Sequence, residues 1–157
     1  MPDEDTLLSR IEDAGLNASA PPQQRWMDGW LVRTNPGKAK RARCVNAVAA
    51  GRLPLAKKLE RAAAAFREAG LPMVVRITPF TQPKDLDAQL AALGWATLDD
   101  TRVMVGAATG LPPPRPLPAG LQWRALGAEA YAEGVGALRG SPPEQRRAHA
   151  KRLALSP

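Results

Sequence analysis

The sequence predicts an α/β fold, and three observations lead to this prediction. Helix-like and strand-like segments alternate between residues 53 and 105. Gly or Pro separates these segments from one another. A strong turn signal at residues 34–37 joins two earlier strand-like segments. Alternation of helices and strands over this length is typical of a layered α/β domain.

The helix predicted over residues 53–70 is the most regular of these segments. Pro54 suits the first turn of a helix, because its missing N–H would have no partner there. The apolar face of this helix consists of Leu55, Leu59, Ala62, Ala63, Phe66 and Ala69. Gly70 favours the left-handed conformation that ends many helices, and Pro72 prevents continuation.

Three further segments follow this helix. Residues 73–77 are a short apolar run bounded by prolines, which predicts a strand buried on both faces. Residues 84–93 have helical spacing and end at Gly94, so they predict a second helix. Residues 101–105 alternate in polarity and predict another strand.

The N-terminal part of the chain predicts a helix followed by a hairpin. Asp5 or Thr6 can cap a helix over residues 7–14, and Gly15 is expected to end it. Residues 26–33 and 41–48 then have the composition of two strands. We expect them to pair through the turn at residues 34–37.

Beyond residue 105 the composition changes. Residues 106–120 are rich in proline and predict a semi-rigid linker. A strand over 121–126 and helices over 128–138 and 144–155 are expected after it. One strand and two helices are too few to close a domain. The sequence therefore predicts a domain over 1–105, the linker over 106–120, and an incomplete second unit over 121–157.

The composition indicates a basic protein inside the cell. The net charge is +7 and the isoelectric point is near 10.3, which favours either an anionic partner or simply a basic surface. The single cysteine, Cys44, excludes an internal disulfide. The acidic residues 3–5 are unlike a secretory signal, and no apolar run approaches membrane-spanning length. We therefore expect a cytoplasmic protein with no membrane segment.

A basic cluster surrounds the predicted hairpin and consists of Arg33, Lys38, Lys40, Arg41 and Arg43. It indicates either an anion site or a charged loop tip that discourages pairing of exposed strand edges.

Two polar residues lie inside predicted strands. A buried amide at Asn46 would need a hydrogen-bond partner, and a buried guanidinium at Arg76 would need a counter-charge. Arg76 is therefore either the partner in an ion pair or a group that faces a cleft.

Four short sequences occur in a particular order along the chain. They are DGWLVR at 28–33, RCVN at 43–46, LPMVVRITPF at 71–80 and LDAQLAALGW at 86–95. In this order they resemble the N-terminal half of a group of bacterial GNAT-family N-acetyltransferases. In that group a degenerate GNAT-like unit precedes a complete acetyl-CoA-binding unit, and residues 131–155 resemble the opening helices of the second unit.

This resemblance implies a GNAT-like mixed sheet flanked by helices. It also implies acetyl transfer from acetyl-CoA to an unknown amine, carried by a small molecule or a peptide. The enzyme would supply proximity, a proton acceptor and a donor for the leaving thiolate.

The resemblance also implies where acetyl-CoA should bind. The GNAT fold holds it between two splayed strands, and N–H groups of a Gln/Arg-x-x-Gly-x-Gly/Ala loop bind its pyrophosphate at a helix N-terminus. Residues 131–136 match this loop poorly, because Tyr131 stands first within a helical pattern. Residues 124–129 end in Glu129, whose charge opposes a phosphate. The family loop is expected beyond residue 157, so this chain is expected to lack a complete acetyl-CoA site.

Four residues are the candidates for a substrate cleft, namely Arg43, Asn46, Arg76 and Thr78. We expect them to orient a substrate rather than to catalyse. The catalytic residues, the acceptor amine and the oligomeric state are left open by the sequence.

Other chemistry is sparse. His149 is expected to be a solvated helix residue, Cys44 a buried apolar one, and Tyr131 a core residue because of its helical spacing from apolar neighbours. No cluster of residues predicts a metal site. The alternative function is a non-catalytic module that binds nucleic acid or another polyanion through the basic cluster and residues 146–152. A chain without activity of its own is the third possibility.

Overall fold

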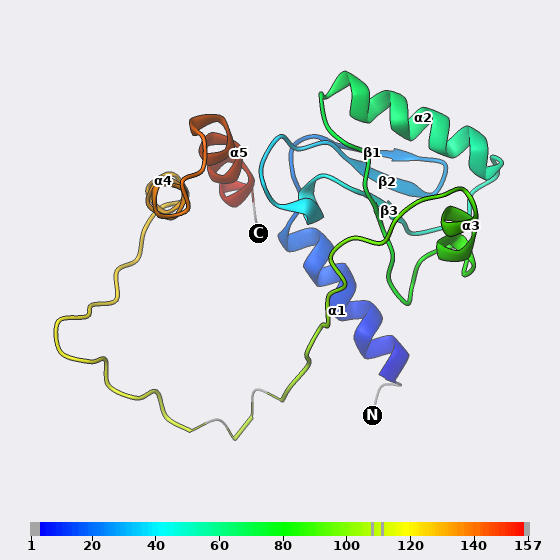
Figure 1. The fold of residues 1–157 in the computed structure, drawn as a ribbon. Coiled ribbons are helices and arrows are strands. Elements are labelled where there is room, and N and C mark those ends of the chain that lie inside the picture. The colour runs from blue at the N-terminus through cyan, green and yellow to red at the C-terminus, as the bar shows by residue number, and fades with distance from the viewer. Residues whose placement is uncertain (1–3, 108, 111, 156–157) are drawn as a thin grey trace.

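The computed structural model describes residues 4–107, 109–110 and 112–155. It has a mixed α/β fold with one four-stranded sheet and five α-helices among these residues (Figure 1). The helices are α1 (Glu4–Ala18), α2 (Leu55–Glu68), α3 (Leu86–Ala92), α4 (Ala128–Leu138) and α5 (Pro143–Ala154). The first of the acidic residues 3–5, positions 108 and 111 of the predicted linker, and residues 156–157 lie outside the described part of the chain.

The sheet has the strand order β1-β2-β3-β4 and contains both kinds of pairing. Its strands are β1 (Gln24–Met27), β2 (Trp30–Arg33), β3 (Val45–Ala47) and β4 (Val75–Arg76). The β1–β2 and β2–β3 pairs are antiparallel, whereas β3 and β4 are parallel. Helix α2 makes the crossover between the parallel strands, as a parallel connection requires.

The predicted hairpin is correct in its pairing but wrong in its boundaries. Trp30 faces Ala47 and Val32 faces Val45 across the β2–β3 pair, so the two predicted segments do meet. However, residues 26–33 are not one strand, because Asp28 and Gly29 both have positive φ angles, 46° and 83°. This is the geometry of a two-residue type I′ hairpin turn, for which Asp-Gly is a preferred sequence.

The second strand of that hairpin is also shorter than predicted. The segment after the turn first forms a short 3₁₀ helix (Lys40–Ala42), and only Val45–Ala47 joins the sheet. Strand β4 likewise covers two residues of the predicted 73–77 and is half-buried rather than buried on both faces.

Helices α2 and α3 cover one face of the sheet, where the hydrophobic core lies (Figure 1). Trp30, Val32 and Val45 point from the strands to Phe66 of α2 and Leu86 of α3. The predicted helix over 53–70 is thus confirmed, with its apolar face on the sheet.

Helix α1 covers the opposite face of the sheet (Figure 1). It continues through Gly15 to Ala18, so the predicted end at Gly15 is wrong. Two carbonyl groups of the last turn have partners that offset the cost of the glycine: Ser19 Oγ donates to the Gly15 oxygen at 2.6 Å, and Arg33 Nη2 to the Leu16 oxygen at 2.8 Å.

The strands predicted at 101–105 and 121–126 are absent. Residues 96–107 and 112–126 contain no helix or strand and run as an extended chain outside the sheet and helices (Figure 1). Met104 and Trp123 are 88% and 87% exposed. Alternating polarity is not sufficient for a strand, because a strand also needs a neighbour with which to pair. Helices α4 and α5 agree with the predictions for 128–138 and 144–155 to within one residue at each end, and they pack against each other as a hairpin.

Candidate functional site

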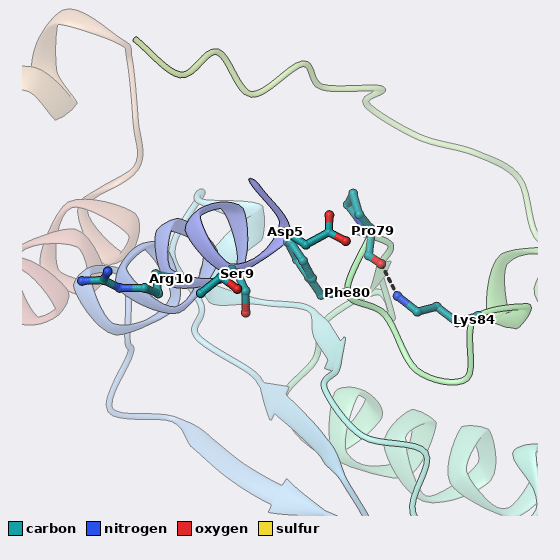
Figure 2. A pocket seen from close by; sticks show the side chains of 7 residues that line it. Asp5, Ser9, Arg10, Pro79, Phe80 and Lys84 are labelled. Carbon is teal, nitrogen blue, oxygen red and sulfur yellow. Dashed lines mark hydrogen bonds between the residues drawn. The ribbon is translucent and has the colours of Figure 1, made fainter. Parts of the chain in front are cut away.

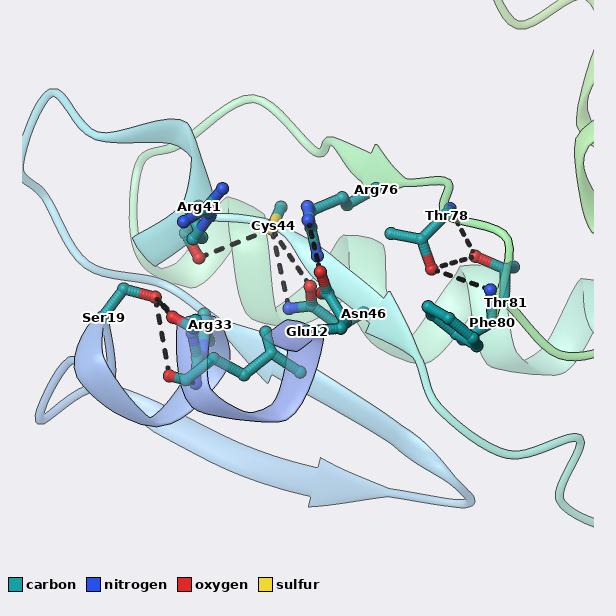
Figure 3. A network of polar contacts seen from close by, with 12 residues as sticks. Glu12, Ser19, Arg33, Arg41, Cys44, Asn46, Arg76, Thr78, Phe80 and Thr81 are labelled. Atoms are coloured by element: carbon teal, nitrogen blue, oxygen red, sulfur yellow. Dashed lines mark hydrogen bonds and ion pairs between the residues drawn. The ribbon is translucent and has the colours of Figure 1, made fainter. Parts of the chain in front are cut away.

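The structure brings together three of the four residues predicted to line a cleft. Asn46 of β3 and Arg76 of β4 are directly opposite each other in the sheet, and Thr78 follows two residues later. Both strand residues lie on the face that α1 covers (Figure 3). Arg43 is half-buried, and its side chain makes no hydrogen bond or ion pair within the described residues. We call the surface of Leu31, Arg33, Asn46 and Arg76 the α1 face of the sheet.

Arg76 is the partner in an ion pair with α1 rather than a free cation in a cleft. Its guanidinium contacts both carboxylate oxygens of Glu12, with Nη2 at 3.0 Å from Oε2 (Figure 3). The hydrogen bonds between these two side chains lower the pKa of Glu12 and raise the pKa of Arg76. This bidentate contact fixes α1 on the sheet.

Arg33 makes a second connection between the α1 face and α1. It is only 1% exposed, and its guanidinium donates to Gln24 Oε1 at 3.1 Å and to the Leu16 carbonyl at 2.8 Å. Asn46 lies beside Cys44, with Nδ2 3.6 Å from the sulfur. Cys44 is buried, as the sequence predicted, and burial raises the pKa of its thiol, which makes it a poor nucleophile.

Thr78 stabilises a turn. The Thr78 N–H donates to Thr81 Oγ1 at 2.8 Å, and Thr78 Oγ1 accepts from the Phe80 N–H at 3.2 Å (Figure 3). A hollow of about 430 Å³ lies beside this turn and is bordered by the first turns of α1 (Figure 2). Its charged groups are Asp5, Arg10 and Lys84, of both signs, and Lys84 Nζ already donates to the Pro79 carbonyl. The side chains that border this hollow therefore do not indicate a particular ligand or reaction.

The loop of residues 48–54, between β3 and α2, holds a carboxylate of the chain itself. The N–H groups of Arg52 and Leu53 donate to the carboxylate of Asp28 at 2.9 and 2.8 Å. Lys58 Nζ lies 3.2 Å from the same carboxylate and donates to the Asp28 carbonyl at 2.8 Å. The backbone hydrogen bonds, more than Lys58, lower the pKa of Asp28. We call this arrangement the Asp28 loop.

Lys58 is the most deeply buried cation of the Asp28 loop. Its side chain is 3% exposed, and its ammonium lies 5.1 Å from the centre of the Trp30 ring. Gly51 has a φ angle of +73°, and a Cβ there would lie 2.1 Å from the Asp28 carbonyl oxygen. The turn at Asp28 and the loop at Gly51 are thus built against each other.

The sequence did not predict the Asp28 loop, because the two segments that resemble the phosphate-binding pattern lie within residues 124–136. Residues 48–53 (VAAGRL) directly follow a strand and precede a helix, and they have Gly51 at the fourth position of the family pattern. Val48 and Leu53 replace the expected polar and small residues. The parallel strands also part here, because the Ala47 carbonyl accepts from the Gln82 N–H at 2.8 Å instead of extending the ladder.

The predicted basic cluster is divided by the fold. Arg33 is committed to α1, and Lys40 forms an exposed ion pair with Asp99. Lys38 instead borders a cavity of about 320 Å³ between residues 35–39 and the α4–α5 hairpin. We call this cavity the basic groove; its charged or titratable lining residues are Lys38, Arg139, Arg146, His149 and Arg152.

The helical side of the groove corrects two predictions. Tyr131 is 45% exposed rather than a core residue, and its ring meets His149 edge-on, with 6.1 Å between centroids. His149 is half-buried in the groove wall rather than freely solvated, and its pKa is lowered by burial and then by Arg152 and Arg139.

Comparisons with family models, with curated proteins and with solved structures find no match to this chain. Within the described residues, no group of His, Cys, Asp and Glu has the arrangement of a metal site. No helix in this part of the chain is long and apolar enough to cross a membrane. The proposals below therefore rest on the geometry above and on the sequence resemblance.

Proposed function

We propose that this chain is a GNAT-like part of an N-acetyltransferase, which transfers an acetyl group from acetyl-CoA to an amine. Residues 4–95, which we call the first unit, support that enzyme without holding acetyl-CoA themselves. The mixed sheet supports this proposal, because three antiparallel strands are followed by a parallel strand that an α-helix connects. The GNAT resemblance leads us to expect a mixed sheet flanked by helices, and a mixed sheet is consistent with that expectation.

The single observation that carries the second part of this proposal, that the first unit does not itself hold acetyl-CoA, is the Asp28 loop. In the GNAT fold, N–H groups at a helix N-terminus bind the pyrophosphate of acetyl-CoA beside two splayed strands. Here the N–H groups of Arg52 and Leu53 already have a carboxylate partner, and the Ala47 carbonyl at the end of β3 already accepts from the Gln82 N–H. A second anion at this place would meet both the volume and the negative charge of Asp28.

The contacts of Asn46 and Arg76 also indicate that the first unit has a structural role. On the α1 face the Asn46 amide lies beside the Cys44 sulfur, and the Arg76 guanidinium is paired with Glu12 of α1. Arg76 is therefore assigned to holding α1 in place, whereas Arg43 remains the member of the predicted set that is free to orient a substrate.

The proposal is tested by following the backbone N–H signals of Arg52 and Leu53 by NMR while acetyl-CoA is added. In the unmodified chain these two signals should not move. In an Asp28→Gly variant, which keeps the positive φ of the turn, both signals should shift on addition of acetyl-CoA. Movement of the signals in the unmodified chain would show that the first unit holds acetyl-CoA. A folded variant whose signals stay fixed would contradict the assignment of this loop as a filled phosphate cradle.

The second candidate is a non-catalytic module for nucleic acid or another polyanion. The observation in its favour is that Lys38, Arg139 and Arg152 lie together without a carboxylate partner among the described residues. Binding to an oligonucleotide would then weaken steeply as salt is added, because each phosphate contact releases a counterion. The burial of Arg33 and the pairing of Lys40 leave fewer cations for such a surface than the sequence suggested.

A further inference from the structure

The basic groove gathers cations that the rest of the fold does not neutralise. No carboxylate is among its lining residues within the described part of the chain. Arg146 is held by Glu133, at 2.5 Å, and by the Ser141 carbonyl, at 2.7 Å. Lys38, Arg139 and Arg152 have no such partner among the described residues. Three positive charges are thus left to face one cavity.

Small residues allow the three segments that line the groove, residues 35–39, α4 and α5, to pack closely together. A Cβ at Gly37 would lie 3.4 Å from the Cβ of Ala148, so the loop rests closely on α5. A Cβ at Gly136 would lie 2.5 Å from Arg146 Cγ, so the Arg146 side chain packs directly against α4 at the position that has no side chain. The cations therefore converge through packing of segments that are distant in the sequence.

Bringing Lys38, Arg139 and Arg152 to one cavity has an electrostatic cost. Arg152 and Arg139 both lower the pKa of His149, which means that their positive charges act at the imidazole. A cation near the C-terminal end of a helix is favourable, and this accounts for Arg139 at the C-cap of α4 and Arg152 in the last turn of α5 taken singly. It does not account for Lys38, which comes to the same cavity from another element. A bound anion would relieve this repulsion.

We propose that the basic groove binds a small molecule that carries phosphate groups. Arginine side chains match the oxygens of a phosphate with paired N–H donors, and several cations suit a ligand with more than one negative charge. The volume of about 320 Å³ is at the small end of the range for ligand pockets. Ala132 and Val135 give the groove an apolar wall that an organic portion of the ligand can contact.

The first test uses inorganic pyrophosphate as the probe and His149 as the reporter. His149 is the only histidine in the chain, so its imidazole signal in a proton NMR spectrum is unambiguous. Pyrophosphate in the groove should raise the pKa of His149 by about 0.5 or more, because a nearby anion favours the charged imidazole. An unchanged pKa at millimolar pyrophosphate would overturn the proposal.

The second test compares two double variants of the full chain with the same change in net charge. Arg139→Ala/Arg152→Ala removes two cations of the groove, and Arg61→Ala/Arg67→Ala removes two exposed cations of α2. The first should weaken pyrophosphate binding about tenfold or more, and the second about twofold at most. Circular dichroism confirms that each variant is folded. Equal weakening in both would show that only the overall charge attracts the anion and would overturn the site.

A single-stranded oligonucleotide distinguishes the source of the phosphate. For the proposed site, pyrophosphate should compete with the small organic phosphate 3′,5′-adenosine bisphosphate, and the oligonucleotide should displace neither at matched phosphate concentration. An oligonucleotide that binds through Arg139 and Arg152 while pyrophosphate does not would overturn the small-molecule proposal in favour of a nucleic-acid surface. These outcomes do not depend on whether the Asp28 loop holds acetyl-CoA.

Discussion

Two groups of charged residues in this molecule differ in how they are neutralised. In the first unit, Arg33, Arg76 and Lys58 are buried or half-buried, and each donates to carbonyl or carboxylate oxygens of the chain itself. In the basic groove, Lys38 and Arg139 are exposed and face a cavity that no carboxylate lines within the described residues. The first group holds the fold together, whereas the second is available to a ligand.

This difference shows why a basic residue cannot be assigned a role from its sequence neighbours alone. Arg33 and Lys38 belong to the same cluster in the sequence and are five positions apart. One is 1% exposed and connects α1 to the sheet, and the other borders the groove. Removing charges from each group should therefore have opposite consequences for stability and for binding.

The largest effect is expected for Arg33→Ala. The substitution leaves the Leu16 carbonyl without its buried donor and removes the packing of a buried side chain, so the free energy of unfolding should fall by about 3 kcal/mol. Chemical denaturation measures this change. Arg25→Ala on the exposed strand β1 is the matched control and should cost less than about 0.5 kcal/mol. Similar losses for both variants would contradict the structural role of Arg33.

The ion pair of Glu12 and Arg76 should have the next largest effect. Each side chain is 21% exposed, so the pair lies between the exposed and the buried cases, and a double-mutant cycle with Glu12→Gln and Arg76→Met should give a coupling of about 1–2 kcal/mol. The same cycle on Lys57 and Glu60, which are each 65% exposed, should give less than about 0.5 kcal/mol. Equal coupling energies would mean that Arg76 does not hold α1 in place.

The same ion pair should make stability depend on pH. The pKa of Glu12 is lower in the folded protein than its ordinary value of 4.5, so the unfolded chain binds more protons in this range. The contribution of Glu12 is therefore complete above about pH 5 and is lost as the pH falls through the lowered folded pKa. Glu12→Gln should reduce the loss of stability between about pH 5 and about pH 3. A variant with an unchanged acid profile would contradict this assignment.

The smallest effect on stability is expected in the basic groove. Arg139→Ala/Arg152→Ala removes two like charges that have no carboxylate partner among the described residues, so the free energy of unfolding should change by less than about 0.5 kcal/mol. Chemical denaturation of the double variant measures this. A loss of about 2 kcal/mol or more would place these arginines with the structural charges of the first unit.

Local patterns predicted the helices well. Helices α2, α4 and α5 could be predicted because the signals for each helix lie within or next to its own segment. These signals are the spacing of apolar residues, the prolines at the start of α2 (Pro54) and of α5 (Pro143), and Gly70 after the end of α2. The mixed α/β architecture followed from the order of these segments. The Asp28-Gly29 turn was also readable, since Asp-Gly is a strong hairpin signal, but the two tryptophans on either side made residues 26–33 look like one strand.

The functional contacts could not be predicted in the same way, because they join distant parts of the chain. Asp28 reaches amides 24 and 25 positions away, and the groove joins residues 35–39 to α4 and α5. The sequence of a short segment does not show which distant residues the segment will contact. The strands predicted at 101–105 and 121–126 failed for a related reason, since a strand is decided by its partner and no partner is present among the described residues.

One titration tests the contrast between the two groups of charges directly. Pyrophosphate is added to the unmodified chain while NMR follows the imidazole of His149 and the backbone N–H signals of Arg52 and Leu53. The filled Asp28 loop and the open basic groove predict that the His149 signal moves with saturation while the two N–H signals stay fixed. Movement of the Arg52 and Leu53 signals with a fixed His149 signal would contradict both assignments.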